Sequence, residues 1–194
     1  LMDIDPRQAL HLSKDIRISA IGITSGLTHE QLVELGNIVR EKGELQSADM
    51  ECEGKMGDGY MCRLEYAPFL FPVVVTAYKG IVETFGYDVR LDLTQAFLYN
   101  EYTGPSGEYP WHIDTNETLM TDMKASYIIN ASVEQYECGR FHIASNGMTN
   151  TAVPQLDTPG EGILFRSTTL HKIEPVVSGK RRSLVFFFEG PHWR

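Results

Sequence analysis

The chain has 194 residues, of which 42% are hydrophobic and 22% are charged, and its formal net charge is −9. Such a length and composition are typical of one globular domain with a sizeable core. The acidic balance argues against a nucleic-acid partner, which needs a basic face, and the sequence has no uninterrupted run of 18 apolar residues that would predict a membrane span.

The cysteines and the first residues bear on the cellular compartment. Cys52, Cys62 and Cys138 form an odd set without a CxxC pair, so neither a disulfide framework nor a thiolate zinc site is indicated. We expect buried, unreactive thiols. The first residues, LMDIDPRQAL, lack the basic start and apolar stretch of a secretory signal. A reducing, cytoplasmic location is the expectation.

Two helices are predicted in the first half of the chain. Thr28-His29-Glu30-Gln31 has the pattern of a capping box, and the run from Leu32 to Val39 has apolar residues at helical spacing, with Gly43 as the expected end. Residues 44–65 are polar and glycine-rich, which predicts a loop or an irregular hairpin. A second helix is expected from Pro72 to Gly86. Both helices are expected to support a sheet and to carry no chemistry.

From Leu93 onward, short runs of β-branched and aromatic residues alternate with turn signals. Eight such strands suggest a sandwich or barrel, and the jelly roll, or double-stranded β-helix, is the eight-stranded form. We therefore expect a mainly β fold with flanking helices (α+β), as a single domain over residues 1–194. Its helical support region would span 1–92 and its jelly-roll core 93–190. The predicted strands are approximately 94–102, 109–114, 124–131, 139–144, 150–154, 162–167, 170–176 and 182–188.

The stretch YPWHIDTN places His112 two residues before Asp114. In a strand, such residues point to the same side, so a nitrogen and a carboxylate oxygen project together. A metal needs a third ligand, for which His142 and His171 are the candidates. The neighbours of His142 supply no partner pattern, whereas His171 stands at the head of a predicted strand. Two histidines and one carboxylate form the facial triad of non-haem Fe(II) oxygenases, which leaves coordination positions open.

The residues after His171 add a second pattern. Arg181 lies ten residues further on, past a Ser-Gly turn, and Ser183 shares its face of the next predicted strand. A fixed guanidinium beside a hydroxyl is suited to binding a carboxylate. Strand alternation turns Arg182 the other way, so Arg182 is expected to be the solvent-exposed arginine. A metal with open positions and a carboxylate receptor together suit a short dicarboxylic keto acid.

With these motifs the sequence resembles the Fe(II)- and 2-oxoglutarate-dependent dioxygenases, and within them the prolyl-hydroxylase-like branch. The resemblance covers roughly residues 93–190. It rests on the motif Tyr102-x-Gly104 followed by Tyr109-x-x-His112-x-Asp114, on the run GILFRSTTLHKIEPV, and on Gly179-x-Arg181-x-Ser183-Leu184.

The resemblance implies a cofactor and a co-substrate. His112, Asp114 and His171 would bind Fe(II). The far carboxylate of 2-oxoglutarate would pair with Arg181, helped by Ser183. O2 would be the second co-substrate, succinate and carbon dioxide the products, and ascorbate would support turnover.

The same resemblance implies which tyrosines would contact the co-substrate. Tyr102 matches a tyrosine that lines the co-substrate pocket in related hydroxylases. Several prolyl hydroxylases carry a second co-substrate tyrosine at the position of Ile128. Tyr127 is one residue away and should face the opposite side, which would leave the far carboxylate to Arg181 and Ser183.

The implied activity is hydroxylation of a prolyl or other residue in a peptide or protein, or of a free amino acid or small molecule. Loops 45–65 and 115–123 are expected to frame the substrate entrance, but their composition names no ligand. One alternative is a metal-binding jelly roll without redox turnover, such as a cupin-like isomerase or a ligand-sensing module, which would not need Arg181 and Ser183. Another is an inactive scaffold, which would not need all three metal ligands.

Overall fold

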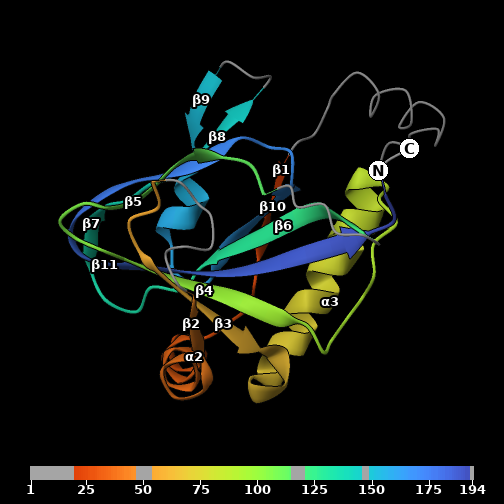
Figure 1. Cartoon of the computed structure of the whole chain (residues 1–194), viewed down its shortest axis with the longest axis horizontal. Coiled ribbons are helices and arrows are strands. Elements are labelled where there is room, and N and C mark those ends of the chain that lie inside the picture. The colour runs from red at the N-terminus through yellow and green to blue at the C-terminus, as the bar shows by residue number, and fades with distance from the viewer. Residues whose placement is uncertain (1–19, 47–53, 115–120, 146–148, 193–194) are drawn as a thin grey trace, which may run out of the picture.

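The computed structural model of this chain describes residues 20–46, 54–114, 121–145 and 149–192 (Figure 1). Within these residues a helical layer covers one face of a large antiparallel sheet, and a smaller sheet lies on the other side. The helices are α2 (His29–Lys42) and α3 (Phe71–Gly80), with short helical turns η1 (Leu64–Tyr66), η2 (Pro68–Leu70), η3 (Ile81–Phe85) and η4 (Pro154–Asp157).

Helix α2 begins and ends where its sequence predicts. The Thr28 hydroxyl accepts a hydrogen bond from the Gln31 backbone N–H at 3.3 Å, and the Gln31 side-chain oxygen accepts one from the Thr28 N–H at 3.0 Å. This is the predicted capping box, which satisfies two N–H groups that lack helical partners. Gly43 ends the helix. The buried face of α2, which includes Leu35, packs on the sheet.

The second predicted helix is also present, with one irregularity. Helix α3 carries Pro72 in its first turn and continues into the π-helical turn η3, which ends at Gly86 in the left-handed conformation, φ 66°. By length and composition the helical segment Pro68–Phe85 is long and apolar enough to cross a membrane. Its polar residues Lys79 and Glu83 are exposed, whereas its apolar face belongs to the core beneath the sheet.

The strands confirm the predicted jelly roll. The major sheet has the order β1-β10-β6-β11-β4-β3-β2, and β5, β7 and β8 pair with the first part of β11, with β9 beside β8. Every pairing is antiparallel. The strands are β1 (Ala20–Thr24), β2 (Glu44–Gln46), β3 (Asp58–Arg63), β4 (Ala96–Thr103), β5 (Gly107–His112), β6 (Asp122–Asn130), β7 (Tyr136–Cys138), β8 (Phe141–Ser145), β9 (Thr149–Ala152), β10 (Glu161–Arg166) and β11 (His171–Gly190).

Strand β11 corrects one prediction. The sequence predicts two strands, 170–176 and 182–188, separated by a turn at Ser178-Gly179-Lys180. The structure has a single strand that pairs with the minor sheet up to Gly179 and with the major sheet from Lys180 onward. Gly179 has φ 75°, a conformation that bends the strand from one sheet to the other without reversing it.

The region before residue 93 supplies strands as well as helices. Strand β1 joins the edge of the major sheet beside β10, and β2 and β3 form an antiparallel pair that extends it beside β4. The expected irregular hairpin in residues 44–65 is thus a part of the sheet, although residues 47–53 lie outside the described range. The two edge strands, β1 and β2, are only five and three residues long, so alternation within them is a weak sequence signal.

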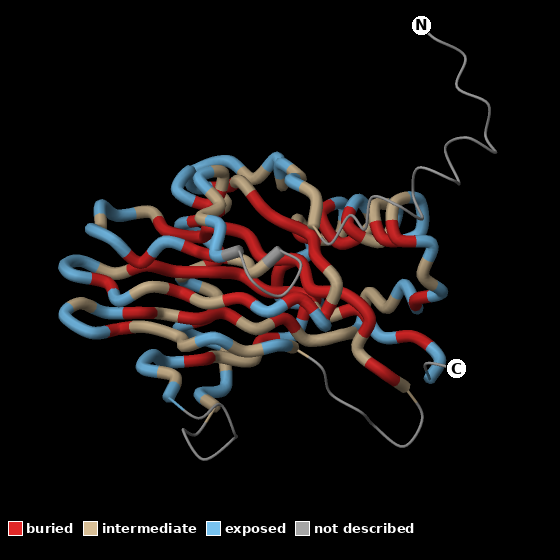
Figure 2. The backbone as a smooth tube through the Cα atoms, turned by 90° about the horizontal axis from the view of Figure 1, so that it is seen from above, coloured by how far each residue is buried: buried red, intermediate tan, exposed pale blue. Residues whose placement is uncertain are grey.

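Two apolar cores flank the major sheet. One lies between the sheet and the helices, and the other between the two sheets, as the buried central strands in Figure 2 indicate. Residues alternate between them: Leu184 and Phe186 on β11 face the helices, whereas Val185 faces the minor sheet. Tyr127 faces the helices, as predicted, and its hydroxyl donates to the Ile23 carbonyl at 2.9 Å.

The thiols differ from expectation. Cys62 is buried, but Cys138 is exposed, because it lies at the end of the short strand β7, which pairs on one side alone. Cys52 lies outside the described residues.

Arg182 is not the exposed arginine that the sequence suggests. Only 7% of it is accessible, and its Nε donates to Glu101 Oε1 at 2.8 Å. Lys180 Nζ donates to the other oxygen of Glu101 at 2.9 Å. Burial would raise the pKa of the Glu101 carboxyl, but Arg182 and Lys180 outweigh it and hold that pKa below its usual range.

The pKa of Glu101 is lower in the folded protein than in the unfolded chain. Ionised Glu101 therefore stabilises the fold at pH values above its unfolded-state pKa, and this stabilisation is lost as the pH falls through its folded-state pKa. We expect Glu101→Gln to lower the free energy of unfolding by about 1–3 kcal/mol at neutral pH. The difference from the parent protein should shrink in acid, as measured by urea denaturation at several pH values. Glu65→Gln removes an exposed ion pair and is the matched control. An equal loss of unfolding free energy at neutral and acid pH would show that the charge of Glu101 does not stabilise the fold.

Candidate metal centre and carboxylate site

Three side chains remote in sequence converge between the two sheets. His171 at the start of β11 is paired directly with His112 at the end of β5. Asp114 follows two residues later, where its backbone N–H donates to the Ser167 carbonyl at 2.9 Å. One potential ligand atom from each of His112, Asp114 and His171 lies within 4.8 Å of the others. The structure therefore brings together the three residues that the sequence singled out as metal ligands.

Both imidazoles turn their Nε2 atoms toward this cluster. His112 Nδ1 lies 2.8 Å from the Pro110 carbonyl, and His171 Nδ1 lies 2.9 Å from the Thr169 carbonyl. A carbonyl oxygen only accepts, so each Nδ1 carries a proton, and in the neutral imidazole Nε2 is then the nitrogen with the lone pair. The two Nε2 atoms lie 3.5 Å from opposite oxygens of Asp114. This is the tautomer that a metal-binding histidine requires.

The local environment favours an ionised Asp114 carboxylate and a neutral His171 imidazole. Burial would raise the pKa of Asp114, but His171, His112 and the Ser126 hydroxyl outweigh it and lower that pKa. Ser126 Oγ donates to Asp114 Oδ2 at 2.7 Å. Burial lowers the pKa of His171, against the opposing charge of Asp114. Such a set of nitrogen and oxygen donors suits a divalent transition metal.

Aromatic rings hold the histidines in place. The Tyr109 ring stacks on His112 at a centroid distance of 3.4 Å. His171 is buried among aromatic side chains: its ring centroid lies 4.7 Å from that of Phe165 and 5.4 Å from that of Phe141. These contacts restrict ring rotation and keep water from the buried side of the cluster.

Arg181 is a buried cation that forms no ion pair with the residues that the structure describes. Its exposed fraction is 1%, and neither Nη1 nor Nη2 has a hydrogen-bond partner within the described part of the chain. Burial lowers the pKa of Arg181, opposed by the nearby phenols of Tyr136 and Tyr102, but a guanidinium stays protonated in proteins. Two unsatisfied buried donors of this kind indicate a missing anion, and a carboxylate matches their geometry.

The other residues expected near a co-substrate share this space. Tyr102, 1% exposed, is paired directly with Arg181 across β4 and β11. Ser183, also 1% exposed, follows Arg181 at i+2. His142 is engaged elsewhere, as expected: its Nδ1 lies 2.6 Å from Asn150 Oδ1 and its Nε2 lies 2.7 Å from Glu174 Oε1.

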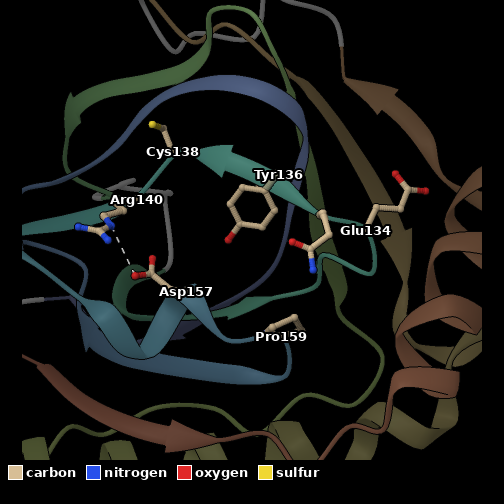
Figure 3. Close-up of a pocket in the computed structure, with 7 residues that line it drawn as sticks. Glu134, Tyr136, Cys138, Arg140, Asp157 and Pro159 are labelled. Atoms are coloured by element: carbon tan, nitrogen blue, oxygen red, sulfur yellow. Dashed lines mark ion pairs between the residues drawn. The ribbon is translucent and has the colours of Figure 1, made fainter.

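Two residues of the site were not foreseen. Ser126 could have been found by alternation, since it lies two residues before Ile128 on the same face of β6. Tyr136 had no usable signal, because only the pairing of β7 with Gly179 brings it near Arg181. Figure 3 shows its ring projecting from β7 into a pocket that Asp157 and Pro159 also line.

Residues 54–58 lie beside the strand that carries His112. The Met56 N–H donates to the Glu108 carbonyl at 2.8 Å, and Lys55 Nζ lies 5.6 Å from the centroid of Tyr109. This agrees with a loop that borders the site. Of the two expected entrance loops, 45–65 and 115–123, residues 47–53 and 115–120 lie outside the described range, and parts of the others belong to β2, β3 and β6.

Comparison with known proteins points to one superfamily. Residues 97–189 match the sequence model of the 2OG-Fe(II) oxygenase superfamily, which confirms the resemblance seen in the motifs. A PKHD-type hydroxylase from Janthinobacterium sp. (strain Marseille) is 31% identical over 102 residues. That alignment covers 47% of this chain and 42% of the relative, so the chain spans less than half the length of the curated relative that it matches.

Solved structures share the fold at low identity. A Pseudomonas putida prolyl-4-hydroxylase superposes with a TM-score of 0.67 and 14% identity, over 94% of this chain and 98% of that one. A prolyl hydroxylase from Trichoplax adhaerens was solved in complex with a peptide fragment of the hypoxia inducible factor oxygen degradation domain. It superposes with a TM-score of 0.62 and 13% identity, over 97% of this chain and 94% of that one. These likenesses confirm the architecture and leave the substrate open.

The unpaired guanidinium predicts an unusual effect on stability. Arg181→Met removes a buried cation whose two terminal nitrogens lack hydrogen-bond partners among the described residues, so the ligand-free protein should become more stable by about 1–3 kcal/mol. The measurement is urea denaturation without added ligand. Arg182→Met is the control and should destabilise, because it leaves the Glu101 carboxylate short of a partner. Equal destabilisation by both changes would show that Arg181 is already satisfied.

Proposed function

We propose that this chain is an Fe(II)- and 2-oxoglutarate-dependent hydroxylase, because residues 97–189 match the sequence model of the 2OG-Fe(II) oxygenase superfamily. One observation carries the proposal. The three clustered donors His112, Asp114 and His171 share the space between the sheets with a buried arginine that lacks an anion. A non-redox cupin-like protein has no need of that arginine.

In this proposal the two Nε2 atoms and the Asp114 carboxylate hold Fe(II). The carbonyls of Pro110 and Thr169 keep the imidazoles in the ligating tautomer, and Ser126 orients the carboxylate. The bound iron, with 2-oxoglutarate and O2, would supply the oxidising power for hydroxylation of a C–H bond, with succinate and carbon dioxide as products.

The chain's own residues would bind and orient the co-substrate. Arg181 would pair with its far carboxylate, with Ser183 beside it and Tyr102 lining the pocket. The apolar residues of the inter-sheet core, such as Ile128 and Val185, would exclude water from this space. Ascorbate would keep the iron reduced between turnovers.

The proposed substrate is a prolyl or other residue in a peptide or protein. Apolar side chains remain exposed next to the metal ligands in sequence: Trp111 at 38%, Ile113 at 46% and Leu170 at 38%. They would offer contacts to peptide side chains outside the cavity. The peptide in the Trichoplax structure is a precedent within the same fold. A free amino acid or small molecule is the second candidate, and screening both classes for the gain of one oxygen atom separates them.

Coupled turnover tests the proposal. The purified chain with Fe(II), ascorbate and 2-oxoglutarate should form succinate in air, slowly even without substrate. His112→Ala and Asp114→Ala should each lose bound iron and all succinate formation, whereas His142→Ala should retain both. Absence of succinate together with absence of 2-oxoglutarate binding under nitrogen would refute the proposed function.

Ser126→Ala tests the orientation of Asp114. Loss of this hydrogen bond should weaken Fe(II) binding by roughly 10- to 100-fold, measured by anaerobic titration calorimetry. Ser132→Ala is a matched control, since Ser132 is equally buried but bonds to the Arg182 backbone. Unchanged affinity in Ser126→Ala, or equal loss in both variants, would contradict the role assigned to Ser126.

A further inference from the structure

Asn130 and Tyr136 lie near Arg181, and the hydrogen bonds of Asn130 determine how its side-chain amide is oriented. Asn130 has an exposed fraction of 0%. Its Nδ2 donates to the Leu156 carbonyl at 3.0 Å and to Tyr136 Oη at 3.1 Å, and its Oδ1 accepts from the Ser132 N–H at 3.0 Å. The carbonyl can only accept and the N–H can only donate, so the orientation of the Asn130 amide is determined.

This orientation decides the role of the Tyr136 hydroxyl. Because the Asn130 amide donates to it, Oη acts there as an acceptor and its own proton points elsewhere. Within the described residues this O–H has no acceptor. A phenol proton cannot be accepted by the neighbouring guanidinium of Arg181, which itself has two terminal nitrogens without partners.

Strand register places the two unsatisfied groups together. The backbone of Tyr136 is paired with Gly179, two residues before Arg181. Asn130, which holds the hydroxyl, is paired with Ser183, two residues after Arg181. The Tyr136 side chain therefore runs alongside Arg181, close enough for its phenol to interact with the guanidinium charge. The Tyr136 hydroxyl and the Arg181 guanidinium are thus neighbouring donors that lack an acceptor, and a carboxylate could accept hydrogen bonds from both.

We propose that Tyr136 donates a hydrogen bond to the far carboxylate of 2-oxoglutarate beside Arg181, and that Asn130 is the positioning residue that aims the hydroxyl. The inference rests on the proposed function, because it assumes that the anion is this co-substrate. Ile128, on the same face of β6 as Asn130, is apolar and offers no donor. The far carboxylate is thus held by a pair of residues from β7 and β11 and not by Arg181 and Ser183 alone.

Tyr136→Phe tests the proposal by binding, under nitrogen, to the Fe(II)-loaded chain. Two ligands are titrated: 2-oxoglutarate, and 2-oxopentanoate, which chelates in the same way but has a methyl group in place of the far carboxylate. We expect the variant to bind 2-oxoglutarate roughly 10- to 100-fold more weakly, the usual effect of losing a hydrogen bond to a charged group. Its affinity for 2-oxopentanoate should equal that of the parent.

The variant should fold, because Tyr136 is only half-buried and lines a pocket of about 310 Å³. Tyr127→Phe is the control: it removes a phenol hydroxyl from the opposite face of the sheet and should leave both affinities unchanged. Equal 2-oxoglutarate affinity in Tyr136→Phe and parent would overturn the proposal, as would equal weakening for both keto acids. A parent chain that binds Fe(II) but not 2-oxoglutarate would overturn the proposed function as well.

Discussion

The pairing of β11 with both sheets is the constraint on which the site depends. Its first part lies against β5, which sets His171 opposite His112, and its second part lies against β4, which sets Arg181 opposite Tyr102. One continuous strand thus carries a candidate metal ligand and the buried cation into the same inter-sheet space. A shift of one residue in either register would turn these side chains to the other face.

The site places stability and binding in opposition. Arg181 is buried with two unsatisfied nitrogens, a state that costs free energy in the ligand-free protein. The adjacent Arg182, on the opposite face of the strand, forms ion pairs with Glu101 through its Nε and with Glu134 through Nη1, so the fold supplies anions to that arginine. Arg181, on the inner face, has no ion-pair partner among the described residues, and there a co-substrate would supply the anion. Uncompensated charge in that position favours a binding role over a structural one.

Strand β6 shows how one strand serves both cores. Its residues Ser126, Ile128 and Asn130 face the minor sheet, where the first orients Asp114 and the last holds Tyr136. Tyr127 faces the helices and is fastened to Ile23. The same alternation that builds two apolar layers therefore also separates residues that support the site from residues that support the fold.

Local patterns were sufficient for most of the elements and for the first two candidate metal ligands. The capping box of α2, the helix from Pro72, most strands and the His112–Asp114 spacing could be predicted because they depend on neighbours in sequence. Contacts across the fold could not. The bend at Gly179, the pairing of Arg182 with Glu101, and the approach of Tyr136 to Arg181 depend on which strands lie side by side. That choice is made by burial and long-range pairing of the whole chain, which no short stretch of sequence encodes.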